Sequence, residues 1–361
     1  MATMRAAVYT EFRGDIAVRS VPKPSAPPGG VLIAVKATGV CRSDWHGWSG
    51  HDEDIAEHGL PFVPGHEVAG VVAEVGHGVA KFAVGDRVAI PFILSCGKCG
   101  YCVRGKPTVC SAQEQPGFTR WGSFAEFVSI PRAERNVAPL PASVTFVAAA
   151  ALGCRTTTAY RAVVMQGALK AGETMVVFGC GGVGLSAILI GARAVGARVV
   201  AVDVSAAALA KATELGAAAT IDASAFGDDA EARRAAVRAA CNGGEGADCT
   251  VDAAGFMATC EDSVWCARRG GRVVQVGLPL GEGVVPQIPM ARVAAWELTL
   301  IGSHGIGPGG FREVLALVER GVFDPARLVT SEVTLAEGAA AIMAMDRGSP
   351  VGVTMVTSGF A

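Results

Sequence analysis

The pattern of hydrophobic and polar positions changes near residue 153 and divides the chain into two parts. Before that point, short Val-rich runs alternate with Gly and Pro turn signals, a pattern typical of β-strands. Four prolines between positions 22 and 28 predict an extended loop within this part. We therefore expect a barrel-like, β-rich domain whose strands include Met4–Tyr9, Val31–Ala37, Glu67–Val75 and Arg87–Pro91.

From Glu173 onward, short apolar runs alternate with Ala-rich stretches of helical character. Such alternation is typical of βαβ units and predicts an α/β domain with a parallel sheet. The predicted strands are Met175–Phe178, Arg198–Val202, Cys249–Val251 and Arg272–Val276, and the predicted helices between them include Val183–Ala194 and Ala206–Glu214.

The last stretch of the chain carries one predicted amphipathic helix, Phe311–Arg320, and one closing apolar run, Val351–Val356. This stretch is too short for a separate domain, so we expect it to pack on the N-terminal domain. The sequence thus predicts one domain from residues 1–153 and 304–361, and a second domain from residues 154–303.

Composition narrows the class of protein. The 361 residues are 51% hydrophobic with a formal net charge of −2, so a large core can form and nucleic acid is not an expected partner. We expect no membrane span and no secretory signal, because the N-terminus lacks a charged head and apolar run. Eleven cysteines in so long a chain favour a reducing, cytoplasmic location over a disulfide framework.

Four cysteines crowd into one short segment, at Cys96, Cys99, Cys102 and Cys110. Two residues between successive cysteines allow a tight turn to bring the thiolates to one tetrahedral point, and the last cysteine closes the shell. A closed four-sulfur shell is typical of structural zinc, which we expect in a lobe spanning residues 95–111. An iron–sulfur cluster and a nucleic-acid-binding zinc ribbon are the alternatives.

A glycine-rich segment follows the predicted strand Met175–Phe178 and begins a predicted helix. We expect Gly179 to permit a tight turn, Gly181 to let a pyrophosphate approach the backbone, and Gly184 to allow close packing of helix and strand. Gly182 and Val183 then offer N–H groups at the helix start. A G-x-G-x-x-G pattern alone is weak evidence, but its position between strand and helix favours dinucleotide binding.

Asp203 ends the next predicted strand, about 20 residues after the glycine-rich segment. A carboxylate there accepts hydrogen bonds from ribose hydroxyls and repels a 2′-phosphate. No arginine follows in Val204 or Ser205, so the sequence favours NAD over NADP.

Cys41, His66 and Cys154 form a second candidate metal site, although each is isolated in the sequence. Two thiolates and one imidazole leave one position open, as a catalytic zinc requires. The alternative is that the cysteines are small core residues and the histidine is satisfied in the core. Asp44 and Glu67 lie beside two of these residues and are candidates for orienting them.

Taken together, these motifs resemble the zinc-dependent medium-chain alcohol dehydrogenases, and the resemblance covers nearly the whole chain. The motifs occur in the family order: C-R-S-D-W-H at 41–46, G-H-E at 65–67, the four-cysteine segment, G-C at 153–154 and the glycine-rich segment. The resemblance implies a Rossmann-type, doubly wound parallel-sheet domain for NAD and a β-rich, GroES-like catalytic domain. It also implies two zinc ions per chain, one catalytic and one structural.

The resemblance further implies a role for individual residues near the catalytic zinc, whose ligands are expected to be Cys41, His66 and Cys154. Ser43 is expected to take the proton of the alcohol, and His46 to pass it to water through the cofactor ribose. Asp44 is expected to hold His66, and Glu67 to approach the zinc during ligand exchange. The residues expected to contact the cofactor are Arg42 at the pyrophosphate, Thr158 on the nicotinamide ring, and the backbones of Val276, Leu278 and Ser303 at the carboxamide.

Some features depart from the family pattern or limit what it implies. Arg155 follows the third zinc ligand where many members have Gly. We expect it to pair with a nearby carboxylate, with a contact to the cofactor or to an acidic substrate as the alternative. Phe92 and Trp48 are candidate walls of the substrate pocket, with core packing as the alternative for Trp48. The short segment between Cys110 and Phe124 resembles bacterial members, which implies a homo-oligomer, with a tetramer favoured over a dimer.

The resemblance implies reversible, NAD-dependent oxidation of a primary or secondary alcohol to an aldehyde or ketone. The aromatic candidates near the site favour an apolar or aromatic alcohol. Dehydrogenation of a polyol, of threonine or of a glutathione adduct is the alternative within the same chemistry. A non-catalytic, NAD-binding structural protein is the alternative from a different class.

Overall fold

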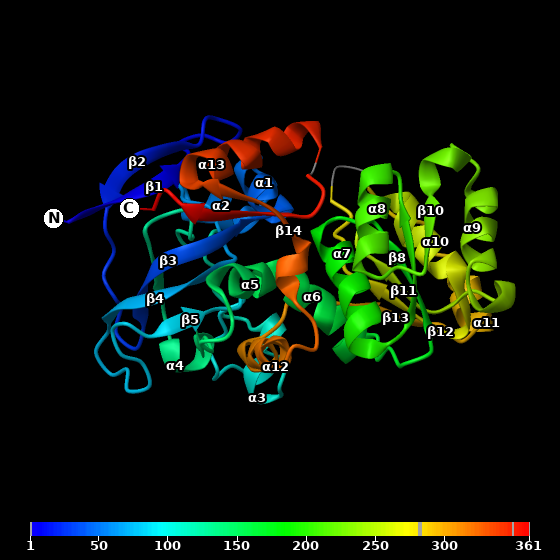
Figure 1. The fold of residues 1–361 in the computed structure, drawn as a ribbon, viewed down its shortest axis with the longest axis horizontal. Coiled ribbons are helices and arrows are strands. Elements are labelled where there is room, and N and C mark those ends of the chain that lie inside the picture. The colour runs from blue at the N-terminus through cyan, green and yellow to red at the C-terminus, as the bar shows by residue number, and fades with distance from the viewer. Residues whose placement is uncertain (1, 281–283, 349, 361) are drawn as a thin grey trace. The chain divides into compact units, whose positions relative to one another are not determined.

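The computed structural model describes residues 2–280, 284–348 and 350–360, and the chain forms two compact units (Figure 1). Unit 1 comprises Met1–Thr157 and Gly305–Ala361, and unit 2 comprises Thr158–His304. Unit 2 begins at Thr158 rather than at the expected residue 154, because a continuous helical stretch from Phe146 to Gln166 crosses the boundary without a turn signal. Cys154 consequently belongs to the same unit as Cys41 and His66.

A mixed seven-stranded sheet forms the framework of unit 1. Its strand β3 (Val31–Val40) pairs antiparallel with β4 (Val68–Val75) on one side and with β15 (Val353–Ser358) on the other. The end of the chain therefore packs on the N-terminal part, as the sequence predicted. The remaining strands of the sheet are β5 (Arg87–Ala89), β6 (Phe127–Ile130), β7 (Ala138–Pro139) and β14 (Val329–Thr334), and a separate pair is formed by β1 (Thr3–Val8) and β2 (Ala17–Pro22).

Short helices border this framework, and two of them correct the sequence predictions. The segment around residues 51–60, for which the sequence predicted no helix, contains helix α2 (Glu53–His58), which buries Ile55. The last stretch of the chain contains a second helix, α13 (Leu335–Ala344), besides α12 (Pro308–Glu319). Helix α13 begins with a capping box formed by Thr334 and Glu337, which an amphipathic pattern does not reveal. The other helices of unit 1 are α1 (Arg42–Trp48), α3 (Gly100–Val103), α4 (Ala133–Asn136) and α5 (Phe146–Ala151).

Unit 2 is built on a six-stranded parallel sheet with the order β10, β9, β8, β11, β12, β13. The chain runs outward from β8 to one edge, returns to β11 beside β8, and runs outward to the other edge, which is a doubly wound arrangement. The strands are β8 (Thr174–Phe178), β9 (Arg198–Asp203), β10 (Ala219–Asp222), β11 (Ala247–Asp252), β12 (Ala267–Gln275) and β13 (Thr299–Gly302). Helix α6 (Thr157–Tyr160) precedes β8. The helices between successive strands are α7 (Gly182–Leu189), α8 (Ala206–Leu215), α9 (Ala230–Ala239), α10 (Met257–Cys266) and α11 (Met290–Ala295).

The apolar runs of both units supply their cores. Strands β8 and β11 are buried at every position, as expected for parallel strands covered on both faces. In β8 this burial matches an apolar run in the sequence, whereas β11 also buries the polar residues Asp248, Thr250 and Asp252. In unit 1, the fully buried aromatic residues Tyr9, Phe62 and Phe124 belong to one large hydrophobic core cluster. Within the described part of the chain, none of the helices combines the length and the apolar character needed to span a bilayer.

Candidate functional site: two metal-ligand clusters and a dinucleotide-binding loop

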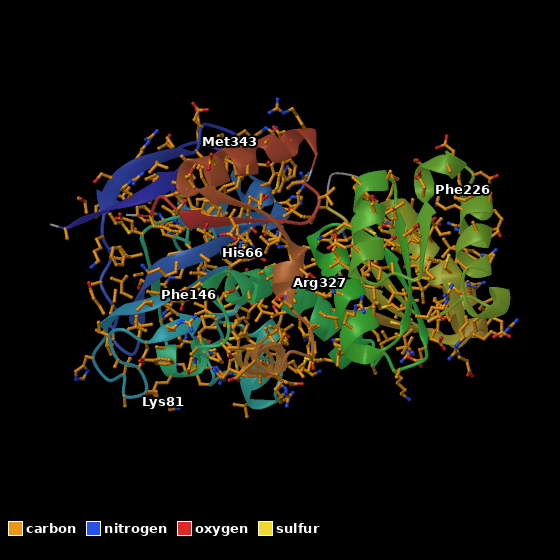
Figure 2. The ribbon with its side chains drawn as sticks, viewed as in Figure 1. His66, Lys81, Phe146, Phe226, Arg327 and Met343 are labelled. Atoms are coloured by element: carbon orange, nitrogen blue, oxygen red, sulfur yellow. The ribbon has the colours of Figure 1, made fainter. Side chains whose placement is uncertain are left out.

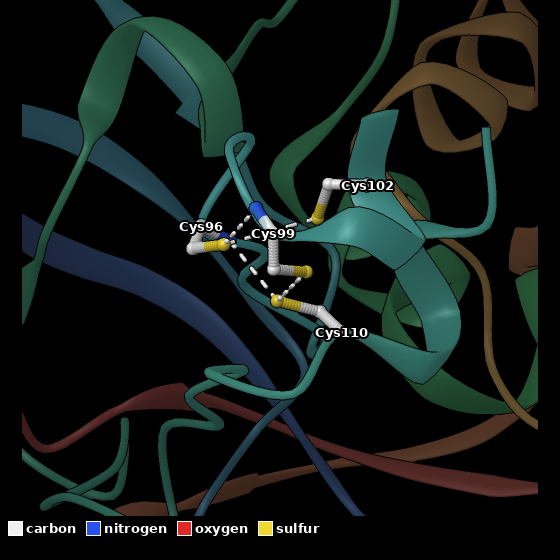
Figure 3. Close-up of side chains that lie close together, drawn as sticks. All are labelled: Cys96, Cys99, Cys102 and Cys110. Carbon is white, nitrogen blue, oxygen red and sulfur yellow. Dashed lines mark hydrogen bonds between the residues drawn. The ribbon is translucent and has the colours of Figure 1, made fainter. Parts of the chain in front are cut away.

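The four-cysteine lobe forms as expected (Figure 3). The sulfurs of Cys96, Cys99, Cys102 and Cys110 all lie within 4.8 Å of one another. The Cys99 and Cys110 sulfurs are 3.7 Å apart, and those of Cys96 and Cys102 are 4.0 Å apart. Ligand bonds of about 2.3 Å in a tetrahedral zinc site place sulfurs about 3.8 Å apart, so the cluster has the size that zinc requires.

Backbone N–H groups point at these sulfurs and favour their thiolate form. The N–H groups of Lys98 and Cys99 donate to Cys96 Sγ at 3.5 and 3.3 Å. The Cys102 backbone N–H, as the largest cause, lowers the pKa of Cys99 to about 5. Because zinc binds thiolates rather than thiols, these contacts suit the lobe to hold a metal ion.

Cys41, His66 and Cys154 come together in unit 1, although the sequence separates them widely. Their ligand atoms lie within 4.8 Å of one another. Cys41 stands directly before α1, His66 lies between Gly65 and β4 (Figure 2), and Cys154 lies in a π-helical turn, Leu152–Thr156. A hydrogen bond from the Cys154 thiol and the positive charge of Arg155 lower the pKa of Cys41 well below its usual range.

The two nitrogens of His66 have different surroundings, and this difference tests whether a metal ion fits. Nδ1 lies 2.9 Å from Asp44 Oδ1, so the expected contact between these residues is present. Asp44 is itself fixed, because it also accepts the backbone N–H groups of Cys41 at 2.9 Å and Gly65 at 3.0 Å. The buried Nε2 has no hydrogen-bond partner in the part of the chain that the structure describes. A buried nitrogen of this kind beside two thiols has the chemistry of a zinc ligand.

Glu67 and Arg155 form a buried ion pair beside these three residues, which confirms the expected pairing of Arg155 with a carboxylate. Glu67 Oε1 accepts hydrogen bonds from Arg155 Nε at 3.0 Å and from the Cys154 backbone N–H at 3.1 Å, and Oε2 accepts from Arg155 Nη2. Arg155 Nη1 donates to the Val40 carbonyl at 2.8 Å. Burial raises the pKa of Glu67, and Arg155 opposes that shift.

Glycines make the space for this pair. A Cβ at Gly39 would lie 1.9 Å from Glu67 Oε2 and 2.7 Å from Arg155 Nη2. A Cβ at Gly153 would lie 2.7 Å from the Glu67 backbone. The small glycines thus leave room for the bulky Arg155 side chain. Its guanidinium group pairs with Glu67 and with the Val40 carbonyl, both in unit 1.

Helix α1 carries the two residues expected to move a proton. Ser43 Oγ lies 3.8 Å from Cys41 Sγ, and His46 lies one helical turn further along, on the same face. Burial, followed by the charges of Arg42 and His51, lowers the pKa of His46 to about 4. The contact of His46 with His51 was not expected from the sequence, because nothing in the local pattern links the two rings.

The aromatic candidates separate into one ring near the site and one in the core. The Phe92 ring lies 6.0 Å from the His66 ring, and Phe118, which sequence reasoning missed, lies 5.0 Å from it. Trp48 is buried in the core of unit 1, with its indole N–H donating to the Gly14 carbonyl at 2.6 Å. These contacts support the core-packing alternative for Trp48, because its indole N–H is satisfied within the core of unit 1.

The Arg42 guanidinium group binds other residues of unit 1. Its Nη1 donates to the Met345 carbonyl at 2.6 Å, and its guanidinium lies 3.6 Å from the centre of the Trp45 ring. Its expected contact with a pyrophosphate stays a prediction.

The glycine-rich segment in unit 2 has the conformation that dinucleotide binding requires. Gly179 directly follows β8 and has a φ of +88°, which strongly favours glycine. A Cβ at Gly184 would lie 1.8 Å from the Gly179 carbonyl oxygen, so this position needs glycine for close packing. A Cβ at Gly181 would meet nothing within 4 Å, so the space before α7 is open to a phosphate.

Of the other candidate cofactor residues, all but Thr158 lie at or shortly after the carboxyl ends of the parallel strands, where ligands bind in this class of sheet. Asp203 ends β9, and its two oxygens accept the backbone N–H groups of Cys180 at 2.6 Å and Ser205 at 2.8 Å. Val276 and Ser303 follow β12 and β13 directly, and Leu278 is exposed nearby in sequence. Thr158 is buried, and its Oγ1 has no hydrogen-bond partner among the described residues.

Comparison with known proteins places both units in recognised domain families. Residues 27–142 match the alcohol dehydrogenase GroES-like domain, and residues 182–320 match the zinc-binding dehydrogenase domain. An alcohol dehydrogenase of Geobacillus stearothermophilus is 38% identical over 284 residues, which cover 78% of this chain and 80% of the relative.

Two solved structures extend the likeness to the whole chain. A crystal structure of an NAD-dependent alcohol dehydrogenase has a TM-score of 0.86 and 32% identity, covering 99% of this chain and 100% of the other. A structure from Sinorhizobium meliloti 1021, described as a zinc-binding dehydrogenase bound to NADP, has a TM-score of 0.86 and 30% identity over the same shares. The chain belongs to the zinc-dependent medium-chain alcohol dehydrogenase family. It is an alcohol dehydrogenase, and its substrates are small alcohols or aldehydes.

Proposed function

We propose that this enzyme catalyses the NAD-dependent, reversible oxidation of an apolar or aromatic alcohol, with zinc held by Cys41, His66 and Cys154. The observation that carries the proposal is the buried Nε2 of His66, which has no hydrogen-bond partner in the described chain and belongs to a ligand cluster with two thiols. A histidine that served only to pack in the core would have a hydrogen-bond partner for each ring nitrogen. The contact of Nδ1 with Asp44 fixes the tautomer that leaves Nε2 free to bind a metal ion.

Three protein ligands leave a fourth position for the substrate, as catalytic zinc sites require. When bound, zinc supplies a Lewis acid that makes the alcohol hydroxyl more acidic, and NAD supplies the oxidant. Glu67 does not compete for the metal while both of its oxygens are bound by Arg155. The four-cysteine lobe would hold the second zinc ion, in a structural role.

The chain itself moves the proton and shapes the substrate site. Ser43, beside Cys41, is placed to accept the proton of the alcohol, and His46 is placed one turn away to receive it. The rings of Phe92 and Phe118, both near His66, form an apolar wall. This wall supports an apolar or aromatic alcohol over a polyol.

Asp203 supports NAD over NADP. Its carboxylate is fixed at the end of β9, and each oxygen has one backbone donor and capacity for another. A ribose with free hydroxyls can donate to these oxygens, whereas a 2′-phosphate would be repelled. Similar proteins include both an NAD-dependent enzyme and an NADP-bound structure, so the choice rests on this residue.

The test is the rate of reduced cofactor formation with a matched panel: ethanol, hexanol, benzyl alcohol, 2-butanol, a polyol and a hydroxymethyl-glutathione adduct, each with NAD and with NADP. We expect the highest kcat/KM with NAD and with hexanol or benzyl alcohol. A preference for the polyol or the adduct would overturn the apolar substrate class. Equal or better rates with NADP would overturn the role of Asp203.

A further inference from the structure

Two histidine rings meet at the end of α1, and the proposed function uses only one of them. Nδ1 of His46 lies 3.2 Å from Nδ1 of His51. The backbone N–H of His51 donates to the His46 carbonyl at 3.0 Å, which holds the two residues together. A proton shared between two ring nitrogens at this distance is donated by one and accepted by the other. The contact is therefore a path along which a proton can move.

Neighbouring side chains hold this pair in place. The Trp45 ring meets both imidazoles edge to face, with centroid distances of 4.9 Å to His46 and 5.4 Å to His51. Trp45 is in turn fixed, because its indole N–H donates to Asp346 Oδ1 at 2.8 Å and Arg42 stacks on its ring. The arrangement thus has support from α1 and from the segment after α13.

Burial decreases along the pair in the direction of solvent. His46 is half-buried, whereas His51 is exposed. Burial and the positive charge of Arg42 lower the pKa of His46, while the Cys41 thiolate acts in the opposite direction. A proton on His46 is consequently held weakly, and His51 offers an acceptor that water can reach.

We propose that His51 is the terminal proton acceptor of the path that begins at Ser43; this inference rests on the proposed function. A proton that reaches Nε2 of His46 forms an N–H bond there, and the proton on Nδ1 of His46 moves to Nδ1 of His51. His51 then releases its Nε2 proton to water or buffer. One proton enters and one leaves, and no electrons are transferred.

The test is the rate of proton release during a single turnover, followed with a pH-indicator dye beside NADH absorbance. We expect His51→Gln to slow proton release by about tenfold or more, and added imidazole to restore it. We expect NADH binding and zinc content to stay as in the wild type, because His51 is an exposed residue that belongs to neither candidate metal cluster nor to the glycine-rich segment. His58→Gln is the matched control: His58 is an exposed histidine on α2 that packs on Phe62, and its substitution should change none of these quantities.

The charged groups around the pair that would shape the pH profile are Arg42 and, through Trp45, Asp346. We expect the pH profile of kcat for His51→Gln to shift, whereas a purely structural loss would lower kcat at every pH. Wild-type proton release and pH profile in His51→Gln, or no rescue by imidazole, would overturn the inference alone. Wild-type protein that binds zinc and NADH yet forms no NADH from any alcohol would overturn the proposed function as well.

Discussion

At the scale of single residues, Glu67 and Arg155 form a buried ion pair beside the three candidate zinc ligands. Replacing Arg155 with Met would leave a buried carboxylate with only backbone donors. Removing one partner of a buried ion pair costs about 3–5 kcal/mol of unfolding free energy, and we expect a loss of that size. Denaturant unfolding of the zinc-loaded protein measures it.

The control for this prediction is the double variant Glu67→Gln/Arg155→Met, which removes both charges. We expect it to recover part of the lost stability, because no unpaired charge remains in the core. Equal stability of Arg155→Met and the wild type would show that the pair is not a structural requirement.

His46 gives a second residue-scale prediction, for the pH dependence of stability. Its pKa falls from 6.5 to about 4 on folding, chiefly because of burial. Between these values the unfolded chain binds the proton and the folded chain does not, so the free energy of unfolding decreases as pH falls through this window. We expect His46→Gln to show a shallower decrease from pH 6.5 to 4 in denaturant titrations. Parallel curves for the two proteins would contradict the assigned burial effect.

How far the sequence predicted each residue depended on whether its partners are local. The four cysteines of the lobe share one short segment, so their spacing alone indicated the site. Cys41, His66 and Cys154 are far apart in the chain, and only the order of the family motifs joined them. Phe118 and His51 escaped prediction because their partners, His66 and His46, are chosen by tertiary packing. The position of Trp48 stayed open in the sequence, because an aromatic residue near a ligand can face either the pocket or the core.

At the scale of elements, two glycines of the glycine-rich segment at the start of α7 serve different purposes, one in folding and one in cofactor binding. A Cβ at Gly184 would collide with the Gly179 carbonyl, whereas a Cβ at Gly181 would enter open space. We expect Gly184→Ala to lower Tm markedly. Gly181→Ala should keep the wild-type Tm and weaken NADH binding, because its methyl group occupies the phosphate position. Thermal melts and NADH titration of both variants test this, and normal NADH affinity in Gly181→Ala would contradict the phosphate site.

Helices and strands could be predicted from the sequence where the hydrophobic periodicity is strong. The prediction failed for short helices and for a helix whose start depends on a capping box. Strands β8 and β9 and helix α8 lie close to their predicted bounds, because their apolar runs end in clear turn signals. Helices α2 and α13 were not predicted, since α2 is short and charged and α13 depends on a capping box. The π-helical turn that holds Cys154 has no recognisable local pattern.

At the scale of the whole molecule, both candidate zinc clusters belong to unit 1, and the dinucleotide loop belongs to unit 2. The chain passes from one unit to the other within a continuous helical stretch, so the sequence shows no linker there. The expected homotetramer stays a prediction, which sedimentation analysis of the purified enzyme would test.

The central claim is that Cys41, His66 and Cys154 hold a catalytic zinc ion. The most direct measurement is zinc content per chain together with alcohol-dependent NADH formation, for the wild type and for Cys41→Ala. We predict two zinc ions in the wild type and one in the variant, which should lose NADH formation while still binding NADH. A variant that keeps two zinc ions, or that still oxidises alcohol at the wild-type rate, would contradict the claim.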